Sequence, residues 1–129
     1  MLIAGERGGR KEGQRLLPAL TETTKARVLQ LATTPLRLGR AVTPVGRALQ
    51  KHAARPGSAF TGATGNAAHN TAVGRQYLLN ILDDPTSTVS HAQHPVFGNV
   101  VKVRRTDGSG FWFKENGEFI GFLEKYLPR

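Results

Sequence analysis

The sequence predicts an α+β domain, in which helices from the first two thirds of the chain pack on an antiparallel β-sheet formed by the last third. Three observations carry this prediction. Helical periodicity recurs before residue 84, and short alternating runs rich in Val and Phe dominate after residue 96. Two sequences typical of hairpin turns, TDGSG and ENGE, separate those runs. A chain of 129 residues corresponds to about one domain and can bury a core of its own.

The N-terminal segment is basic and divides from the rest of the chain near residue 40. Residues 21–34, TETTKARVLQLATT, place threonine caps before an apolar pattern and predict a first helix. Residues 35–52 predict a second helical segment that is interrupted by proline. We therefore divide the chain into a basic linker or helical lead-in, residues 1–40, and a functional domain, residues 41–129. The alternative is that the lead-in is a linker from a larger protein with no function in this domain.

The stretch LQKHAARPGSAF, residues 49–60, places an imidazole between two cations where a helix breaks at a Pro-Gly turn. His52 lies between Lys51 and Arg55. An imidazole titrates near neutrality and can therefore act as a general acid or base. The plainer alternative is that His52 caps the last free carbonyl groups of its helix.

A loop rich in Gly, Thr and Asn, FTGATGNAAHN, follows this turn. The next helix is predicted from about residue 67 to residue 82, because the apolar residues near its end share one face. Asp84-Pro85 ends this helix, since a residue before proline disfavours helical backbone. Residues 85–95, PTSTVSHAQHP, are predicted to form a polar loop.

The remainder predicts a three-stranded meander, with strands in FGNVVKVRR, GFWFK and EFIGFLE. A two-residue turn at Asn116-Gly117 sets the register of the second hairpin and puts Trp112 opposite Gly121. This register also predicts one apolar face for the core. The residues of that face are Phe111, Phe113, Ile120 and Phe122.

The first hairpin could close with a loop of two or three residues. A two-residue loop would bury Lys102 and Arg104, at a cost of several kcal/mol for each unpaired cation. We therefore predict a three-residue loop, residues 107–109, which adds Val101 and Val103 to the apolar face. The opposite face then carries Lys102, Arg104, Trp112 and Lys114.

The charge of the chain favours a polyanionic partner. It has 18 Lys and Arg residues against 9 Asp and Glu residues, a net charge of +9. Contacts between such cations and phosphate release condensed counterions. Nucleic acid is therefore the favoured partner, ahead of an acidic protein or an anionic membrane. A basic strand face that bears Trp112 suits RNA, because an indole can stack on an unpaired base. The alternative is an ordinary solvated strand face on which Trp112 covers Gly121.

Composition also excludes several classes of protein. The chain has no cysteine and hence no disulfide, and it lacks an apolar run of about 20 residues, so we expect a soluble protein. His91 and His94 could bind a metal ion in principle, but further ligands are missing and the acidic residues are too scattered for a two-metal site. We therefore predict neither a metal ion nor another cofactor.

Five pieces of the sequence, LQKHAARPGSAF, ATGN, FGNVVKV, TDGSGFWF and NGEFIGFLE, follow a pattern found in known toxins. With them, residues 49–124 resemble the C-terminal toxin domains of bacterial polymorphic toxins, of the CdiA, filamentous-haemagglutinin and RHS types. The resemblance implies the fold of the barnase, EndoU, colicin and RelE (BECR) superfamily of ribonucleases, with N-terminal helices on an antiparallel sheet. One position departs from it: Trp112 stands where the pattern has an arginine, whose role would be lost or taken by Lys102, Arg104 or Lys114.

The resemblance implies a metal-independent ribonuclease toxin that cuts tRNA. Such cleavage needs a base for the 2′-hydroxyl proton, cations for the phosphorane and an acid for the 5′-oxygen, and it leaves a 2′,3′-cyclic phosphate. The candidate catalytic residues are His52, Arg55, Lys102 and Arg104. The candidate RNA-binding residues are Lys51, Ser58, Thr61, Thr64, Asn66, Trp112 and Lys114.

Several of these residues have simpler interpretations. Ser58, Thr61, Thr64 and Asn66 are common turn formers, and Asn66 beside a glycine could merely supply a left-handed backbone. His69 and Asn70 form a second pair of interest, although His69 fits a surface residue at the start of a helix.

Two rival functions remain at this point: a non-catalytic RNA- or ribosome-binding module, and a DNase toxin. The resemblance implies that the chain is the C-terminal part of a larger secreted toxin and acts in the cytoplasm of a target cell. It also implies two partners, tRNA and a cognate acidic immunity protein. We expect a monomer without stable membrane insertion.

Overall fold

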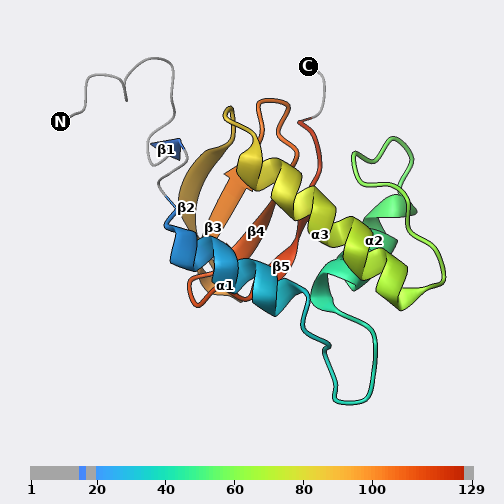
Figure 1. Ribbon diagram of the computed structural model, residues 1–129. Helices are drawn as coiled ribbons and strands as arrows, with labels where there is room; N and C mark the ends of the chain where they lie inside the picture. The colour runs from blue at the N-terminus through green and yellow to red at the C-terminus, as the bar shows by residue number, and fades with distance from the viewer. Residues whose placement is uncertain (1–14, 17–19, 127–129) are drawn as a thin grey trace.

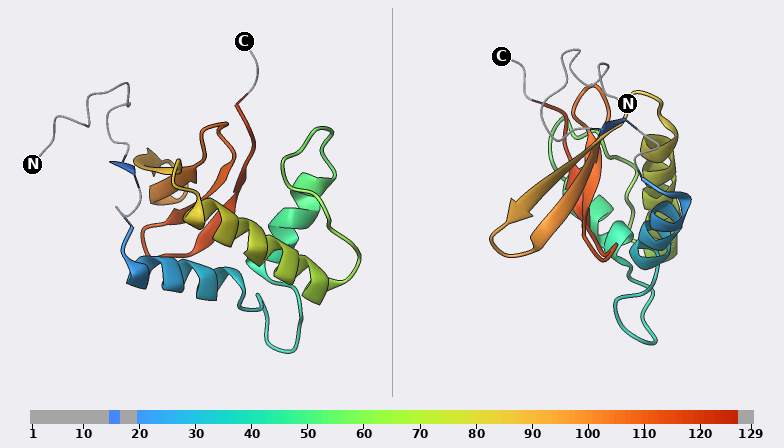
Figure 2. Two further views of the ribbon diagram at one scale, coloured as in Figure 1. Left: turned by 45° about the horizontal axis from the view of Figure 1, so that its top comes forward. Right: turned by 90° about the vertical axis from the view of Figure 1, so that its left-hand side faces the viewer.

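The computed structural model describes residues 15–16 and 20–126 of the chain. Its helices are α1 (Glu22–Ala32), α2 (Pro44–Ala53) and α3 (Ala67–Asp83). Figure 1 shows α1 and α3 across one face of an antiparallel sheet, and the right-hand view of Figure 2 shows both helices on the same side of it. Helix α2 packs against both α3 and the last strand. This is the α+β architecture that the sequence predicts.

The strands of the sheet lie side by side in their chain order, and each pair of neighbours is antiparallel. The described part of the first strand has two residues and pairs with the second strand. The last strand is therefore an edge of the sheet. The strands are β1 (Arg15–Leu16), β2 (Thr88–His94), β3 (Gly98–Arg104), β4 (Gly110–Lys114) and β5 (Phe119–Leu123).

Each helix begins at a polar cap. The side-chain oxygens of Thr21, Thr43 and Asn66 each accept a hydrogen bond from the backbone N–H three residues later. Pro44 follows the second cap at the first helical position, where its missing N–H costs nothing. The segment predicted as helical from residue 35 therefore becomes a helix only from Pro44. No helix in the described part of the chain is long and apolar enough to cross a membrane.

The polar loop predicted for residues 85–95 is wrong in part, because Thr88–His94 form β2. Its one fully buried residue is Val89, which pairs with Val103 of β3. The rest of the strand is half-buried or exposed, and among the described residues two of β1 pair with its outer edge. A strand with one buried residue lacks the alternating apolar pattern by which strands are recognised.

The hairpin of β3 and β4 has the predicted faces, with its loop shifted by one residue. The backbone N–H of Arg105 donates to the carbonyl of Ser109 at 2.8 Å, so residues 106–108 form the three-residue loop. A shift of one residue on both strands keeps the same side chains on each face. Val103 accordingly pairs with Phe111 in the core, and Lys102 pairs with Trp112 on the other face.

The predicted two-residue turn at Asn116-Gly117 is wrong, and so is the predicted pairing of the residues next to it, Glu115 with Glu118 and Phe113 with Ile120. Trp112 pairs with Gly121 as predicted, but an irregularity follows and Phe113 pairs with Phe119. The loop has three residues, 115–117, because the Lys114 N–H donates to the carbonyl of Glu118 at 2.8 Å. A three-residue loop of this kind, with Gly117 at φ +97°, introduces an extra residue into one strand. Phe119 therefore enters the core and Ile120 is only half-buried, contrary to the prediction.

Helix α1 belongs to the hydrophobic core. Val28 and Ala32 are 1 % and 0 % exposed, which means that this part of the lead-in is not a linker. The Nε of Arg27 donates to the carbonyl of Asn116 at 2.7 Å and so ties α1 to the loop between β4 and β5. The boundary at residue 40 stays a prediction.

Candidate active site

The last turn of α2 holds His52 against the end of β5. The side chain is 9 % exposed. The rings of Phe60 and Phe122 meet the imidazole edge-on, with ring centres 5.8 and 5.9 Å away. These contacts restrict how the imidazole can turn, and they account for the burial of a histidine that follows an exposed lysine.

Glu124, the residue after β5, fixes the proton on this imidazole. Its Oε2 lies 2.7 Å from Nδ1 of His52. A carboxylate oxygen only accepts hydrogen bonds, so Nδ1 must carry a proton and donate it. The neutral imidazole then has an unprotonated Nε2, for which the described residues supply no hydrogen bond. This tautomer can accept a proton at Nε2, as a general base does.

The loop after α2 holds the carboxylate of Glu124 in turn. The hydroxyl of Ser58 donates to Oε2 at 2.6 Å, and the backbone N–H of Ala59 donates to Oε1 at 2.9 Å. Burial opposes ionisation of Glu124, but the hydrogen bonds from Ser58, Ala59 and His52 outweigh it and lower the pKa of the carboxyl. Glu124 is therefore an anion at neutral pH and remains a hydrogen-bond acceptor for His52.

Cations of α2 and the following turn surround the histidine. Nη1 of Arg55 lies 3.3 Å from Nδ1 of His52. Because Nδ1 already donates to Glu124, the guanidinium supplies positive charge at this position rather than a second hydrogen bond. Lys51 is exposed beside it, and Arg47 lies one helical turn earlier on the same face. Together they can bind a phosphate next to the imidazole.

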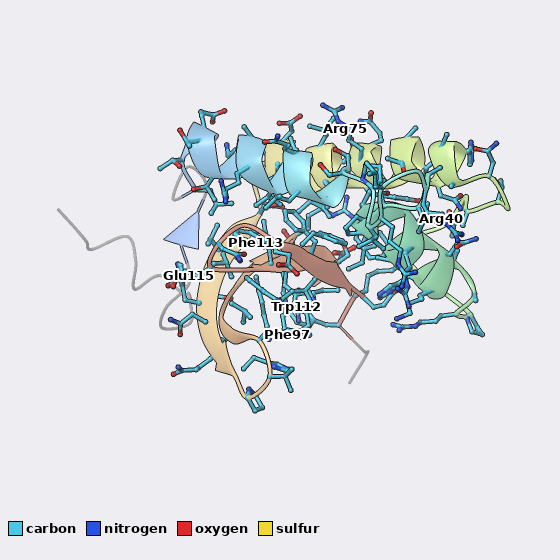
Figure 3. The ribbon with its side chains drawn as sticks, turned by 90° about the horizontal axis from the view of Figure 1, so that it is seen from below. Arg40, Arg75, Phe97, Trp112, Phe113 and Glu115 are labelled. Carbon is cyan, nitrogen blue, oxygen red and sulfur yellow. The ribbon has the colours of Figure 1, made fainter. Side chains whose placement is uncertain are left out.

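A groove of about 580 Å³ runs between α2 and the sheet, and His52 lines it. Phe97 and Trp112 line it from the sheet. Figure 3 shows these two rings on the side of the sheet away from α1 and α3, whereas Phe113 lies between the sheet and those helices. The groove thus brings together the histidine and the tryptophan that sequence reasoning singled out separately.

The open side of the sheet carries an aromatic cluster, formed by His94, Phe97 and Trp112, whose ring centres are 4.8 to 5.7 Å apart. The Nζ atom of Lys102 lies 5.6 Å from the centre of the Trp112 ring, and that of Lys114 lies 5.5 Å from the Phe97 ring. This surface is the basic, aromatic strand face that the sequence predicts. Trp112 both faces Gly121 across the strands and lines the groove.

The groove is not lined by the strand cations Lys102, Lys114 and Arg104, which share one face of the sheet. Arg104 has partners of its own. Its Nη1 donates to the carbonyl of Gly108 at 2.6 Å. Its guanidinium carbon lies 5.1 Å from the centre of the Tyr126 ring. These contacts place Arg104 at the turn between β3 and β4.

The polar loop residues predicted to bind RNA are engaged by the loop itself, by α3 and by Glu124. The N–H of Thr61 donates to the Tyr77 hydroxyl at 2.9 Å, and the hydroxyl of Thr64 accepts from the N–H of Asn66 at 3.1 Å. Asn66 has a φ of −96° and caps α3, so its interpretation as a left-handed residue is wrong. None of these three residues lines the groove, and Ser58 acts through Glu124.

The other histidines have local partners or lie apart from the groove. Nε2 of His69 lies 3.0 Å from the carbonyl of Gly62, and the buried amide of Asn70 bonds both backbone groups of Thr64 at 2.8 Å. Nδ1 of His94 accepts from the N–H groups of the turn after β2. His91 and His94, three residues apart in one strand, point to opposite faces. Among the described residues, no three side chains form a metal-binding group.

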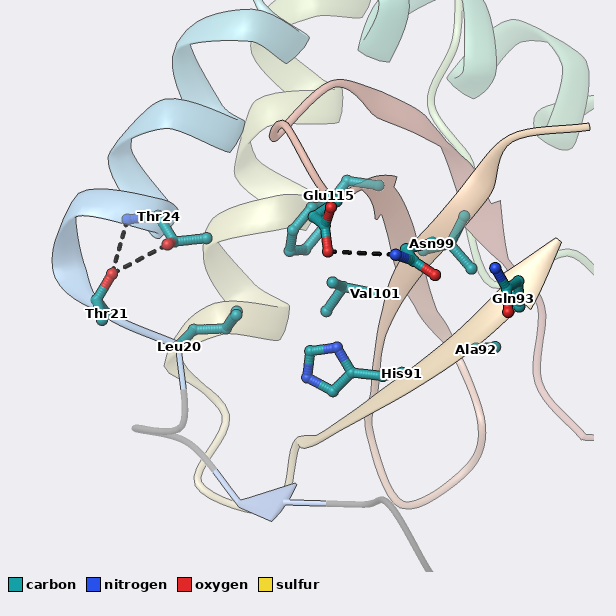
Figure 4. A pocket seen from close by; sticks show the side chains of 11 residues that line it. Leu20, Thr21, Thr24, His91, Ala92, Gln93, Asn99, Val101 and Glu115 are labelled. Atoms are coloured by element: carbon teal, nitrogen blue, oxygen red, sulfur yellow. Dashed lines mark hydrogen bonds between the residues drawn. The ribbon is translucent and has the colours of Figure 1, made fainter.

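A larger hollow, of about 650 Å³, lies where α1 begins beside β2 and β3. Figure 4 shows His91 and Glu115 in it, with the start of α1 at one side. The carboxylate there is 3.4 Å from the amide of Asn99 and does not contact His91 in the structure. With neither an oriented histidine nor a cluster of cations, this hollow is a poorer site for catalysis than the groove beside His52.

Sequence reasoning missed two residues of the site. Glu124 has no predicted role, although it lies two residues after Phe122 and hence on the same side of the strand. Arg47 lies four residues before Lys51, a spacing that puts both on one helix face. The alternation of side chains along a strand would have identified Glu124, and the spacing of residues on a helix face would have identified Arg47. Both inferences need the knowledge that α2 crosses the end of β5.

The model of one protein family, the CdiA C-terminal tRNase toxin domain, matches residues 31–124. A similar solved structure is the toxic C-terminal tip of CdiA from Pseudomonas aeruginosa, crystallised in complex with an immune protein. The two chains are 23 % identical with a TM-score of 0.60, over 74 % of this chain and 99 % of that one. No curated protein matches in sequence. The residues matched by the family model include the whole of α2, β5 and Glu124.

Proposed function

The chain belongs to the family of CdiA C-terminal tRNase toxin domains, and on that premise we propose that it cuts tRNA through attack of a ribose 2′-hydroxyl on the adjacent phosphate. Membership of a tRNase family makes the chain an endoribonuclease, which decides against a DNase and against a non-catalytic binding module. The proposed reaction uses side chains alone. It leaves a 2′,3′-cyclic phosphate on one product and a 5′-hydroxyl on the other.

In this proposal His52 is the general base. Nε2 takes the proton of the 2′-hydroxyl as the 2′-oxygen forms its bond to phosphorus. The bond from phosphorus to the 5′-oxygen then breaks, and that oxygen takes one proton from solvent. The imidazolium later releases its own proton to solvent. Glu124 stabilises the imidazolium and holds the tautomer that leaves Nε2 free, in the manner of the carboxylate in a catalytic triad.

Cations in and beside the groove bind and stabilise the reacting phosphate. Arg55 and Lys51 flank His52 at the end of α2, and Lys102 lies over the Trp112 ring. Fixed positive charge is most effective where negative charge builds up on the phosphorane oxygens. Trp112 stacks on an unpaired base and so positions the RNA strand along the groove. Arg104 does not share this role, because its guanidinium is held by the carbonyl of Gly108 at the turn between β3 and β4.

The observation that carries the proposal is the 2.7 Å contact between His52 and Glu124 at the wall of a basic groove. The test is His52→Ala, assayed on purified tRNA in the presence of EDTA. Loss of a general base should lower the rate of cleavage by about 10²–10⁴-fold. Mass spectrometry of the wild-type product should find the cyclic phosphate.

His69→Ala is the matched control, because His69 is an exposed histidine outside the groove. It should retain wild-type activity. If His52→Ala instead kept full activity per folded molecule, and lost only about 1 kcal/mol of stability, His52 would be a helix cap and the proposed mechanism would fail.

We extend the proposal to partners and place of action. The CdiA tip from P. aeruginosa was crystallised with an immune protein, and we propose that an acidic immunity protein inhibits the present chain by covering its basic surface. The domain acts as a monomer in the cytoplasm of the target cell, to which a larger secreted protein delivers it. Sedimentation of the purified domain, alone and with its inhibitor, would test the monomeric state.

A further inference from the structure

A second hollow, of about 380 Å³, lies on the other side of Glu124 from the histidine. Arg55 lines both this hollow and the groove. Glu124 lines the hollow while its Oε2 bonds His52. The side chain of Glu124 therefore separates the second hollow from the catalytic imidazole. Adjacent nucleotides of one RNA strand could span that separation past Arg55.

An aromatic ring is held in place at this second hollow. Tyr126 is 53 % exposed, yet its backbone N–H donates to the carbonyl of Asp107 at 2.8 Å. The guanidinium of Arg104 lies over the ring, and Arg104 is itself bonded to the carbonyl of Gly108. Gly108 has no side chain to displace the ring, and a Cβ there would lie 2.6 Å from ring atoms of Tyr126. An exposed ring that is held in this way offers a fixed surface for a ligand.

The charges around the ring favour an anionic strand. Arg55 and Lys125 line the hollow, and Arg104 lies against Tyr126. The acidic groups nearby are already engaged: Glu124 by the loop after α2, and Asp107 by the hydroxyl of Ser109 at 2.6 Å. Phosphate therefore meets cations here without a competing free carboxylate among the residues that the structure describes.

We propose that Tyr126, backed by Arg104, is a second base-stacking subsite, which binds a nucleotide on the opposite side of the scissile phosphate from the nucleotide on Trp112. This inference rests on the proposed role of His52 as the catalytic centre between the two hollows. It gives Arg104 a positioning role instead of a catalytic one. An unpaired base and its phosphate then pass Arg55 on the way from one ring to the other.

The test compares Tyr126→Ala, Tyr126→Phe and Trp112→Ala on RNA fragments that span the cut site and are shortened one nucleotide at a time from each end. Tyr126→Ala should weaken binding of the full fragment by about 5- to 150-fold, the equivalent of one base stack of about 1–3 kcal/mol. The loss should vanish once trimming from one particular end removes the stacked nucleotide. Trp112→Ala should show the same behaviour for the other end, and Tyr126→Phe should bind as the wild type does.

Binding is measured in a His52→Ala background by fluorescence anisotropy, so the result does not depend on cleavage. A His52→Ala protein that still cuts RNA would overturn the proposed function, whereas the binding data would still decide the role of Tyr126. The subsite proposal falls if Tyr126→Ala binds every fragment as tightly as its parent, or if its loss persists after trimming from either end. It also falls if the substitution weakens only the complex with the immunity protein, because the ring would then be a protein contact.

Discussion

At the scale of single residues, the two oxygens of Glu124 have different partners, and this difference predicts the effect of an isosteric change. Oε1 accepts from the N–H of Ala59, and Oε2 accepts from His52 and Ser58. In Glu124→Gln the remaining oxygen is needed at Ala59, so the new NH₂ group faces Nδ1 of His52. A donor at that position forces Nδ1 to accept and moves the proton to Nε2. We expect cleavage to fall by about 10²–10⁴-fold, as in other enzymes that lose the correct tautomer.

Nitrogen-15 NMR of the imidazole checks this reason directly. In the wild-type protein the neutral imidazole of His52 should carry its proton on Nδ1. In the Glu124→Gln protein the imidazole should carry it on Nε2. Ser58→Ala removes one donor to the carboxylate without changing the acceptor at His52, and should therefore have the milder effect. Wild-type activity in Glu124→Gln, with an unchanged tautomer, would mean that the carboxylate only packs against the histidine.

At the scale of elements, the burial of α1 predicts that the lead-in contributes to folding. Val28 is 1 % exposed within the core, and replacing it with alanine leaves a cavity. Val28→Ala should lower the free energy of unfolding by about 1–3 kcal/mol, measured by urea denaturation. Gln30→Ala, an exposed change in the same helix, should stay within about 0.5 kcal/mol of the wild type. Equal stability of the two variants would return α1 to the role of a linker.

The individual helices and strands also show which parts of the fold can be predicted from the sequence. Helix α3 was predicted almost to the residue, because an apolar face and Asp84-Pro85 define its end locally. Strand β2 was missed because one buried valine does not make a pattern. The predicted burial of Ile120 was wrong because one extra residue in the turn at Gly117 changes which side chains face the core. The sequence ENGE is compatible with a loop of two residues and with a loop of three.

The candidate site follows the same division between local and distant information. The cluster of Lys51, His52 and Arg55 lies within five residues and was found from the sequence. The pairing of His52 with Glu124 depends on how α2 crosses the end of β5, and nothing in either segment alone specifies that crossing.

At the scale of the whole molecule, the net charge of +9 predicts how an acidic inhibitor finds the protein. Opposite charges steer encounter over distances that salt screens, about 10 Å at 0.1 M and about 3 Å at 1 M. The association rate constant for the proposed immunity protein, followed by stopped-flow fluorescence, should therefore fall steeply between those concentrations. The dissociation rate should change less. An association rate that is independent of salt would remove electrostatic steering from the account of this complex.

The hydrogen bond between His52 and Glu124 joins positions 72 residues apart in the chain. It forms only after β5 has joined the sheet and α2 has packed on it. A chain that has not yet folded holds His52 apart from Glu124, and its imidazole then has no fixed tautomer. Under the proposed mechanism, such a chain is therefore inactive until its last strand has joined the sheet.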